Sequence, residues 1–128
     1  MRLLGIDYGR RKIGLALSTD KLAEPYSVIR YVKFEEGIRR VGQVVKVEQV
    51  EKVIVGISEG KIAEETRDFG KALRGATGVK VVYQDETLTT QNAQELSLQA
   101  GLKRNKRKKL EDAYAATLIL QSYLDSHP

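Results

Sequence analysis

The sequence contains no cysteine and only one histidine, His127, near the end of the chain. The absence of cysteine excludes disulfides, thiolate nucleophiles and cysteine-based zinc sites. Chain ends are usually frayed, so His127 is a poor general base for a Ser-His-Asp arrangement. Any hydrolytic chemistry must therefore rest on carboxylates, hydroxyls, lysines and a hard metal ion.

Long apolar runs are missing as well. No segment approaches the length needed to span a bilayer, and Met1 and Arg2 lead directly into an apolar stretch without the layout of a signal peptide. We therefore expect a cytoplasmic protein that does not bind membranes. Aromatic residues make up 6% of the chain and few accompany its charged segments, so base stacking is not indicated.

The remaining composition is that of one globular domain. The 128 residues are 41% apolar and 30% charged, which suffices for a hydrophobic core beneath a polar surface. Because no repeat, linker or low-complexity segment interrupts the chain, we predict a single domain over residues 1–128. A net charge of +5 favours an anionic partner.

Hydrophobic periodicity predicts an α/β fold. Two apolar, glycine-containing runs flank a polar turn near the start of the chain, which is typical of an antiparallel hairpin. A third strand completes a meander, after which amphipathic helices alternate with continuous apolar strands. Right-handed crossovers then give a five-stranded mixed sheet with helices on both faces and the first strand in the middle. The predicted strands are 3–9, 13–17, 25–32, 52–57 and 79–83, and the predicted helices are 34–49, 63–74, 87–99 and 110–124.

Three acidic residues are expected at one edge of this sheet. Asp7 lies in an otherwise apolar strand, where an isolated carboxylate is costly, and Gly9 leaves room for a phosphate nearby. Glu86 follows the last strand, and Asp112 shares a helix face with two alanines that allow close packing on the sheet. Each acid also has a structural explanation, as a turn acceptor for Asp7 and as helix-start acids for Glu86 and Asp112.

If Asp7, Glu86 and Asp112 converge without a histidine or cysteine, cations must lie between them. Oxygen-only ligation suits Mg²⁺ or Mn²⁺. Two such ions about 3.5–4 Å apart activate a water and stabilise the leaving oxygen in phosphodiester hydrolysis. We therefore predict these carboxylates to be both catalytic and metal-binding.

Positive charge is concentrated directly before Asp112 and in the hairpin turn. Six of the seven residues from 103 to 109 are cationic. An isolated run of this kind is often a solvated loop, but beside a phosphodiester site it fits a basic loop that clamps the backbone without reading sequence. The predicted nucleic-acid-binding residues are Arg10, Arg11, Lys12, Lys103, Arg104, Lys106, Arg107, Lys108 and Lys109.

Three sequence blocks resemble the signature blocks of the YqgF family, also called RuvX. They are Gly5–Gly9 with Ile13–Ala16, then Asp85–Thr90, and finally Asp112–Ala116 with Ile119 and Leu120, and the match spans nearly the whole chain. This family has an RNase H-like fold and is described as Holliday junction resolvases and as nucleases maturing the 5′ end of pre-16S rRNA. The resemblance implies metal-binding catalytic roles for Asp7, Glu86 and Asp112.

The chain departs from the family pattern at two places. Thr87 stands where the family commonly has an arginine or similarly large residue, which leaves any substrate contact from that position open. Residues 55–60 lack the proline of the family's Val-Gly-Leu-Pro and enter a shorter loop, so substrate contacts from that loop are not expected. Glu59 in this loop is a reserve metal ligand.

The preferred interpretation is a metal-dependent nuclease acting on structured nucleic acid. The family description places 5′-end processing of pre-16S rRNA ahead of Holliday junction resolution, so the partner is an rRNA precursor or branched DNA. A resolvase needs a symmetric dimer to cut two opposed strands, and the sequence leaves monomer and homodimer open. Two other classes compete: a phosphate-binding module related to actin-like and sugar-kinase ATPases, disfavoured by length, and a ribosome assembly factor that binds nucleic acid without catalysis.

Overall fold

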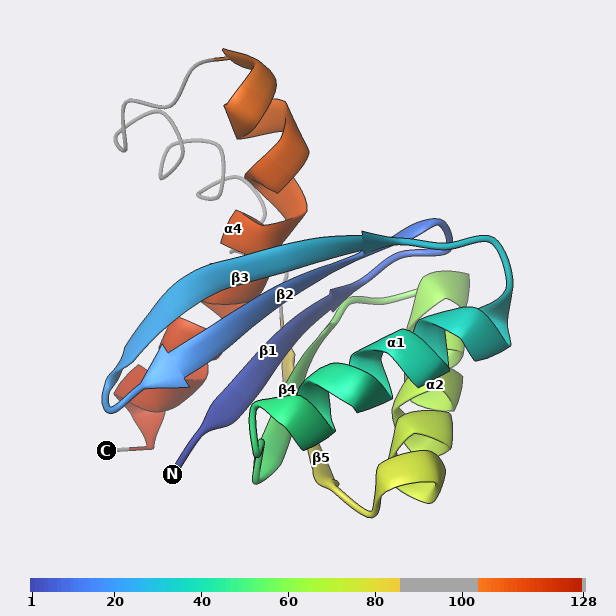
Figure 1. The fold of residues 1–128 in the computed structure, drawn as a ribbon, viewed down its shortest axis with the longest axis horizontal. Coiled ribbons are helices and arrows are strands. Elements are labelled where there is room, and N and C mark those ends of the chain that lie inside the picture. Colours follow the sequence, from blue (N-terminus) through green and yellow to red (C-terminus); the bar gives the residue numbers. More distant parts are fainter. Residues whose placement is uncertain (86–103, 128) are drawn as a thin grey trace.

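A five-stranded sheet with helices on both faces forms the molecule (Figure 1). The computed structural model describes residues 1–85 and 104–127, with residues 104–110 described by their backbone alone. The predicted helix over 87–99 lies outside these residues and stays a prediction. The described elements are β1 (Leu3–Tyr8), β2 (Lys12–Thr19), β3 (Leu22–Arg30), α1 (Phe34–Val47), β4 (Lys52–Ile57), α2 (Lys61–Thr77), β5 (Lys80–Asp85) and α4 (Arg104–Ser126).

The sheet has the order β3-β2-β1-β4-β5. The first three strands pair antiparallel as a meander, and β4 and β5 run parallel to β1. The predicted mixed sheet with the first strand in the middle is therefore confirmed. Because β1, β4 and β5 run in one direction, their carboxyl ends share one edge of the sheet, where sites in open α/β sheets usually form.

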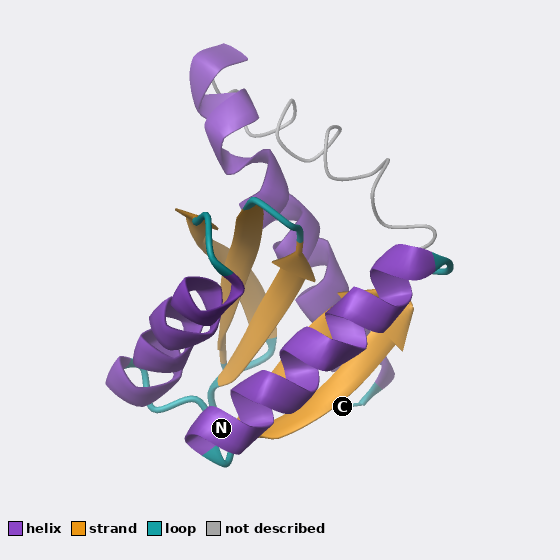
Figure 2. Cartoon of the chain, turned by 90° about the vertical axis from the view of Figure 1, so that its right-hand side faces the viewer, coloured by secondary structure: helices purple, strands orange, loops and turns teal. Residues whose placement is uncertain are grey.

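Each face of the sheet is covered by its own helices, as the two views in Figures 1 and 2 show. Strand residues alternate between the faces, so β1 contributes Leu4 and Ile6 to one side and Leu3 and Gly5 to the other. The first side packs on α1 and α2 through Phe69 and other apolar residues. The second side packs on α4. Among the described helices, none is long and apolar enough to cross a membrane.

The predicted end of the second helix at Gly75 is wrong. The helix continues to Thr77 and is capped by Gly78, which has φ 74° and donates its N–H to the carbonyl of Arg74. Two glycines three residues apart offer two possible ends, and the left-handed conformation is adopted at the second. Gly75 stays helical, at a cost of about 1 kcal/mol relative to alanine.

The last helix begins earlier than predicted. We expected it to start at Leu110 after a basic loop, with Asp112 in its first turn, but α4 begins at Arg104. Lysine and arginine are good helix formers, and neither glycine nor proline interrupts residues 104–110. The first turns of α4 extend beyond the sheet (Figure 1). Asp112 therefore lies inside the helix, which excludes its interpretation as a helix-start acid.

The third strand also begins earlier than predicted, at Leu22. Asp20 has φ 60° in the tight turn that joins β2 to β3, and Thr19 pairs with Leu22 directly after it. Pro25 lies within the strand and not at its start. It is tolerated there because β3 is an edge strand and the register shifts beside Ala16, the partner of Pro25.

Candidate active site

Asp7 lies near the carboxyl end of β1 on the face covered by α4. It shares this face with Leu3 and Gly5, because strand side chains alternate. Leu3 packs in the cluster that includes Leu120 of α4, and an ideal Cβ on Gly5 would lie only 2.7 Å from the Cβ of Leu120. The half-buried Asp7 thus continues a row of residues that the helix covers.

Gly14 brings α4 against the sheet directly beside Asp7. Gly14 is the cross-strand partner of Asp7 in the pairing of β1 with β2. An ideal Cβ on Gly14 would lie 2.0 Å from the carbonyl oxygen of Asp112, so no side chain fits between strand and helix. The structure therefore brings two of the three predicted carboxyl residues, Asp7 and Asp112, to neighbouring positions on one face.

Lys12 completes this cluster with a positive charge. It is the first residue of β2 and lies on the same face as Gly14, two positions along the strand. Its Nζ is 2.9 Å from Oδ2 of Asp112, with the two side chains 45% and 24% exposed. An ion pair this accessible to solvent contributes about 0.2–1 kcal/mol. Sequence reasoning grouped Lys12 with the nucleic-acid-binding residues and missed its contact with Asp112.

The turn between β1 and β2 is held in place by Tyr31. The Tyr31 N–H donates to the carbonyl of Arg11 over 3.0 Å, and its hydroxyl donates to the carbonyl of Gly9. Burial of the ring, with the nearby Tyr8 adding to the effect, raises the pKa of the Tyr31 hydroxyl well above its ordinary value. The hydroxyl is therefore favoured in its protonated form and donates the hydrogen bond that fixes the basic turn, a role that no local sequence pattern indicated.

Arg10 at the tip of this turn is paired with helix α2. Its Nε donates to Oε2 of Glu65 over 2.7 Å, and both side chains are exposed. The hydrogen bond to Glu65 raises the pKa of Arg10 above its already high value. In this structure the turn's basic residues thus divide between two acidic partners, Glu65 for Arg10 and Asp112 for Lys12, while the side chain of Arg11 is exposed.

For most of the remaining predicted site residues, the structure describes either the backbone alone or nothing. Glu86 and Lys103 lie outside the described residues. The cationic residues from Arg104 to Lys109 form helical backbone directly before Asp112, so the predicted basic loop is a basic helix start. Glu59, the reserve ligand, is exposed after the end of β4.

Comparison with known proteins identifies the family. A family model described as "RuvX: Holliday junction resolvase" matches residues 1–126. The chain belongs to the RuvX family. It is 41% identical to a protein of Caldanaerobacter subterraneus subsp. tengcongensis, covering 98% of this chain and 97% of the relative, and 38% identical to one of Lactococcus lactis, covering 98% and 95%. Both relatives carry the name "Putative pre-16S rRNA nuclease".

Solved structures with the same fold include two resolvases bound to junctions. "T. thermophilus RuvC in complex with Holliday junction substrate" matches with a TM-score of 0.63 at 21% identity, over 99% of this chain and 95% of that one. The fowlpox virus resolvase with its junction DNA matches with a TM-score of 0.66 at 16% identity, over 99% of both chains. At these identities the likeness concerns the fold, which is RNase H-like as expected for the RuvX family.

The carboxylates of this RuvX chain fit a hard divalent cation. Among the side chains that the structure describes, no group of three acidic, histidine or cysteine residues is placed to hold a metal. Asp7 and Asp112 supply two carboxyl groups, and the Lys12 ammonium shows that Asp112 already attracts a cation. Mg²⁺ is commonly bound by one or two carboxylates with water and substrate phosphates. The donor set therefore suits Mg²⁺ or Mn²⁺.

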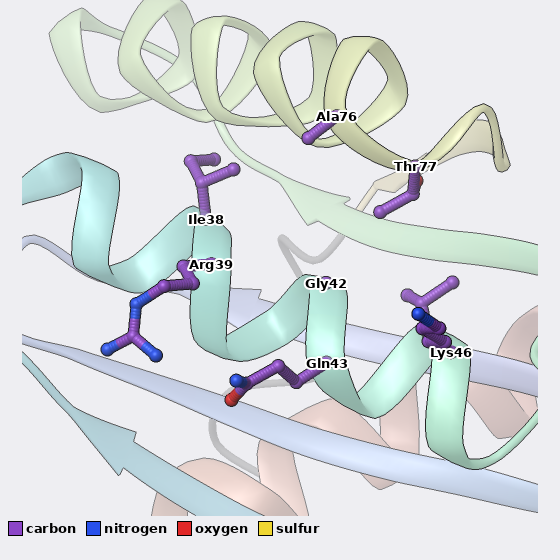
Figure 3. Close-up of a pocket in the computed structure, with 8 residues that line it drawn as sticks. Ile38, Arg39, Gly42, Gln43, Lys46, Ala76 and Thr77 are labelled. Atoms are coloured by element: carbon purple, nitrogen blue, oxygen red, sulfur yellow. The ribbon is translucent and has the colours of Figure 1, made fainter.

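A cavity of about 440 Å³ lies elsewhere, between α1 and α2 (Figure 3). Ile38 of α1 points toward α2, from which Ala76 and Thr77 point back, while Arg39 points away from α2. None of the predicted site residues lines this cavity. It is therefore separate from the cluster of Asp7, Lys12 and Asp112 on the α4 face.

Proposed function

We propose that this RuvX-family chain is a metal-dependent nuclease that hydrolyses a phosphodiester bond in structured nucleic acid, and that its reaction is 5′-end processing of pre-16S rRNA. The observation that carries the proposal is the placement of Asp112 against Gly14, the cross-strand partner of Asp7. This contact joins the first strand and the last helix at an edge of the sheet where catalytic sites usually form. The names of the curated relatives support the choice of rRNA.

Asp7 and Asp112, with Glu86 as the third predicted ligand, would hold Mg²⁺ or Mn²⁺. The bound cations would supply Lewis-acid activation of a water and neutralise charge on the leaving oxygen. The chain's own part is positional: β1 and α4 are rigid elements, and the close contact at Gly14 fixes their separation. Catalytic groups on regular elements are held more tightly than groups on loops.

The basic residues around the carboxylates would hold the nucleic-acid backbone. The helix start from Arg104 to Lys109 lies just before Asp112 in the chain, and Arg10 and Arg11 lie in the turn that joins β1 to β2. Lysine and arginine contacts to phosphates provide affinity without sequence specificity.

Cleavage assays with two labelled substrates test the proposal. We expect the wild-type protein with Mg²⁺ or Mn²⁺ to cut a 5′-extended 16S rRNA precursor, and Asp7→Asn to abolish cutting while binding is kept. Retained cleavage in Asp7→Asn excludes Asp7 as a catalytic residue. Salt-sensitive binding without cleavage by the wild type identifies an assembly factor instead of a nuclease.

Holliday junction resolution is the second candidate, and the description of the matching family model favours it. The same assay with a four-way DNA junction separates the two reactions. A resolvase must cut two opposed strands and is expected to act as a two-fold symmetric dimer. Junction cleavage together with a dimer in sedimentation analysis would select resolution, whereas a monomer that cuts only the precursor RNA selects rRNA processing.

A further inference from the structure

Lys12 lies near both carboxyl residues of the proposed site, Asp7 on β1 and Asp112 on α4. Its backbone belongs to β2, and its Nζ lies 2.9 Å from Oδ2 of Asp112 on α4. It shares its face of the sheet with Gly14, whose cross-strand partner is Asp7. A diagonal neighbour on one face of an antiparallel pair lies about 7–8 Å away, so Lys12 is also close to Asp7.

The ammonium group of Lys12 and a metal ion would compete for the same carboxylate. A divalent cation on Asp112 carries twice the charge of the ammonium, and like charges at contact distance repel. The lysine stem is flexible and its side chain is 45% exposed, so the ammonium can leave without breaking packing. The exchange is therefore inexpensive for the fold.

We propose that Lys12 is an exchangeable counter-ion of Asp112: it occupies the carboxylate in the metal-free protein, is released when the metal binds, and then contacts a phosphate of the nucleic acid. The proposal rests on the proposed metal-dependent function. It makes metal binding and nucleic-acid binding mutually favourable, because the metal frees the cation that the backbone attracts. Such coupling is reciprocal, so nucleic acid should raise metal affinity by the same factor.

Mn²⁺ binding to the nucleic-acid-free protein tests the competition directly. We expect Lys12→Met to bind Mn²⁺ about two- to fivefold more tightly than wild type in calorimetry or electron paramagnetic resonance titrations, as expected for removal of an exposed ion pair. Lys12→Arg keeps a cation and should stay within twofold of wild type. Arg11→Met is the matched control, because it removes one positive charge from the same turn without touching Asp112.

Coupling is read from nucleic-acid affinity with Ca²⁺ replacing Mn²⁺, so that the metal ligands stay intact and no substrate is cut. In wild type, the ion should tighten binding of the labelled precursor RNA, and Lys12→Met should lose most of this gain. Unchanged Mn²⁺ affinity in Lys12→Met overturns the proposal. If Arg11→Met raises Mn²⁺ affinity as much as Lys12→Met does, the proposal is also overturned, because the rise then comes from the change in net charge.

If the proposed metal-dependent function is wrong, the Mn²⁺ titrations differ from those expected when only the Lys12 proposal is wrong. If wild type binds no Mn²⁺, or if Asp112→Asn binds it as tightly as wild type, Asp112 is not a metal ligand and the proposed function itself fails. Circular dichroism checks that each variant is folded. Met matches the apolar stem of lysine, so loss of packing is not expected to obscure the comparison.

Discussion

Tyr31 shows how a single side chain can organise the functional surface from outside it. The ring is buried against α1, where an ideal Cβ on Gly37 would lie 3.2 Å from the ring carbons, while the hydroxyl reaches the carbonyl of Gly9. The backbone N–H of the same residue binds Arg11. Tyr31 therefore fixes both sides of the Arg10 turn and, through it, the start of β2 where Lys12 stands.

We expect Tyr31→Phe to lower the free energy of unfolding by about 1 kcal/mol, because it removes one partly buried hydrogen bond and keeps the ring packing. Urea denaturation measures the change. Tyr26→Phe is the control, since Tyr26 is 41% exposed and donates to Glu48 over 3.2 Å at the surface. Equal losses in the two variants would mean that the Tyr31 hydroxyl has no special part in holding the turn.

Glu65 restrains Arg10 in a similar way, by an ion pair at the surface. Glu65→Gln should free the Arg10 guanidinium for a phosphate and raise the affinity for RNA by about two- to fivefold at low salt. Glu64→Gln makes the same charge change at an exposed position on the same helix and is the matched control. The prediction fails if fluorescence anisotropy gives the same affinity for both variants.

At the level of elements, the contact of α4 with the hairpin sets how Asp7 and Asp112 of the proposed site lie relative to each other. Two strand glycines leave space for the helix, Gly5 beneath Ala116 and Leu120, and Gly14 beneath Asp112. Because protein interiors are closely packed, a helix cannot yield locally at one of these points and keep its register at the other. Small changes in the hairpin should therefore move Asp112 relative to Asp7.

Gly14→Ala tests this dependence. Its Cβ would lie 2.0 Å from the Asp112 carbonyl oxygen, so we expect a loss of about 1–3 kcal/mol of stability together with weaker Mn²⁺ binding. Gly75→Ala is the matched control: nothing lies within 4 Å of its ideal Cβ, and the helix interior of α2 should gain about 0.5–1 kcal/mol. Unfolding in urea and Mn²⁺ titration of both variants give the answer. Unchanged stability and unchanged Mn²⁺ affinity in Gly14→Ala would contradict the close contact between Gly14 and the Asp112 backbone.

Most strand positions were predictable because short apolar runs mark buried strands locally. The continuous apolar run of β4 was predicted with its observed bounds, and the order of the sheet followed from connection rules. Helix ends were harder. Gly75 and Gly78 have equal capping ability, and the cationic run before Asp112 has good helix propensity despite its charge repulsion.

Site contacts were predictable only in part. The neighbouring placement of Asp7 and Asp112 was predictable because a carboxylate in an apolar strand and small residues on a helix face are local signals, whereas their catalytic roles stay predictions. The pairing of Lys12 with Asp112 and that of Arg10 with Glu65 join residues far apart in sequence. Such contacts depend on how elements pack, and no spacing in the chain encodes them.

At the scale of the whole molecule, positive charge lies on both faces of the sheet, and only part of it is expected to contact nucleic acid. The net charge of +5 includes lysines on α1 and α2, on the opposite face of the sheet from α4, and the cationic start of α4 beside Asp112. Counterion release depends on the charges that meet phosphates and not on the total. The salt dependence of binding should therefore report which face carries the nucleic acid.

We expect a double variant, Lys106→Gln with Arg107→Gln, to reduce the slope of log affinity against log salt by about 0.7–0.9 for each phosphate that the protein no longer neutralises. Lys46→Gln with Lys71→Gln removes the same charge from exposed positions on α1 and α2 and should leave the slope unchanged. Anisotropy titrations of labelled RNA between low and moderate KCl measure both. A larger effect from the control pair would place the RNA on the other face.

The packing of α4 against β1 has a consequence for folding during synthesis. The candidate site unites the first strand with the last described helix, so a nascent chain carries Asp7 long before it carries Asp112. Such distant pairing closes late during folding. On a translating ribosome, a growing chain therefore lacks the pairing of Asp7 with Asp112 until α4 has left the exit tunnel.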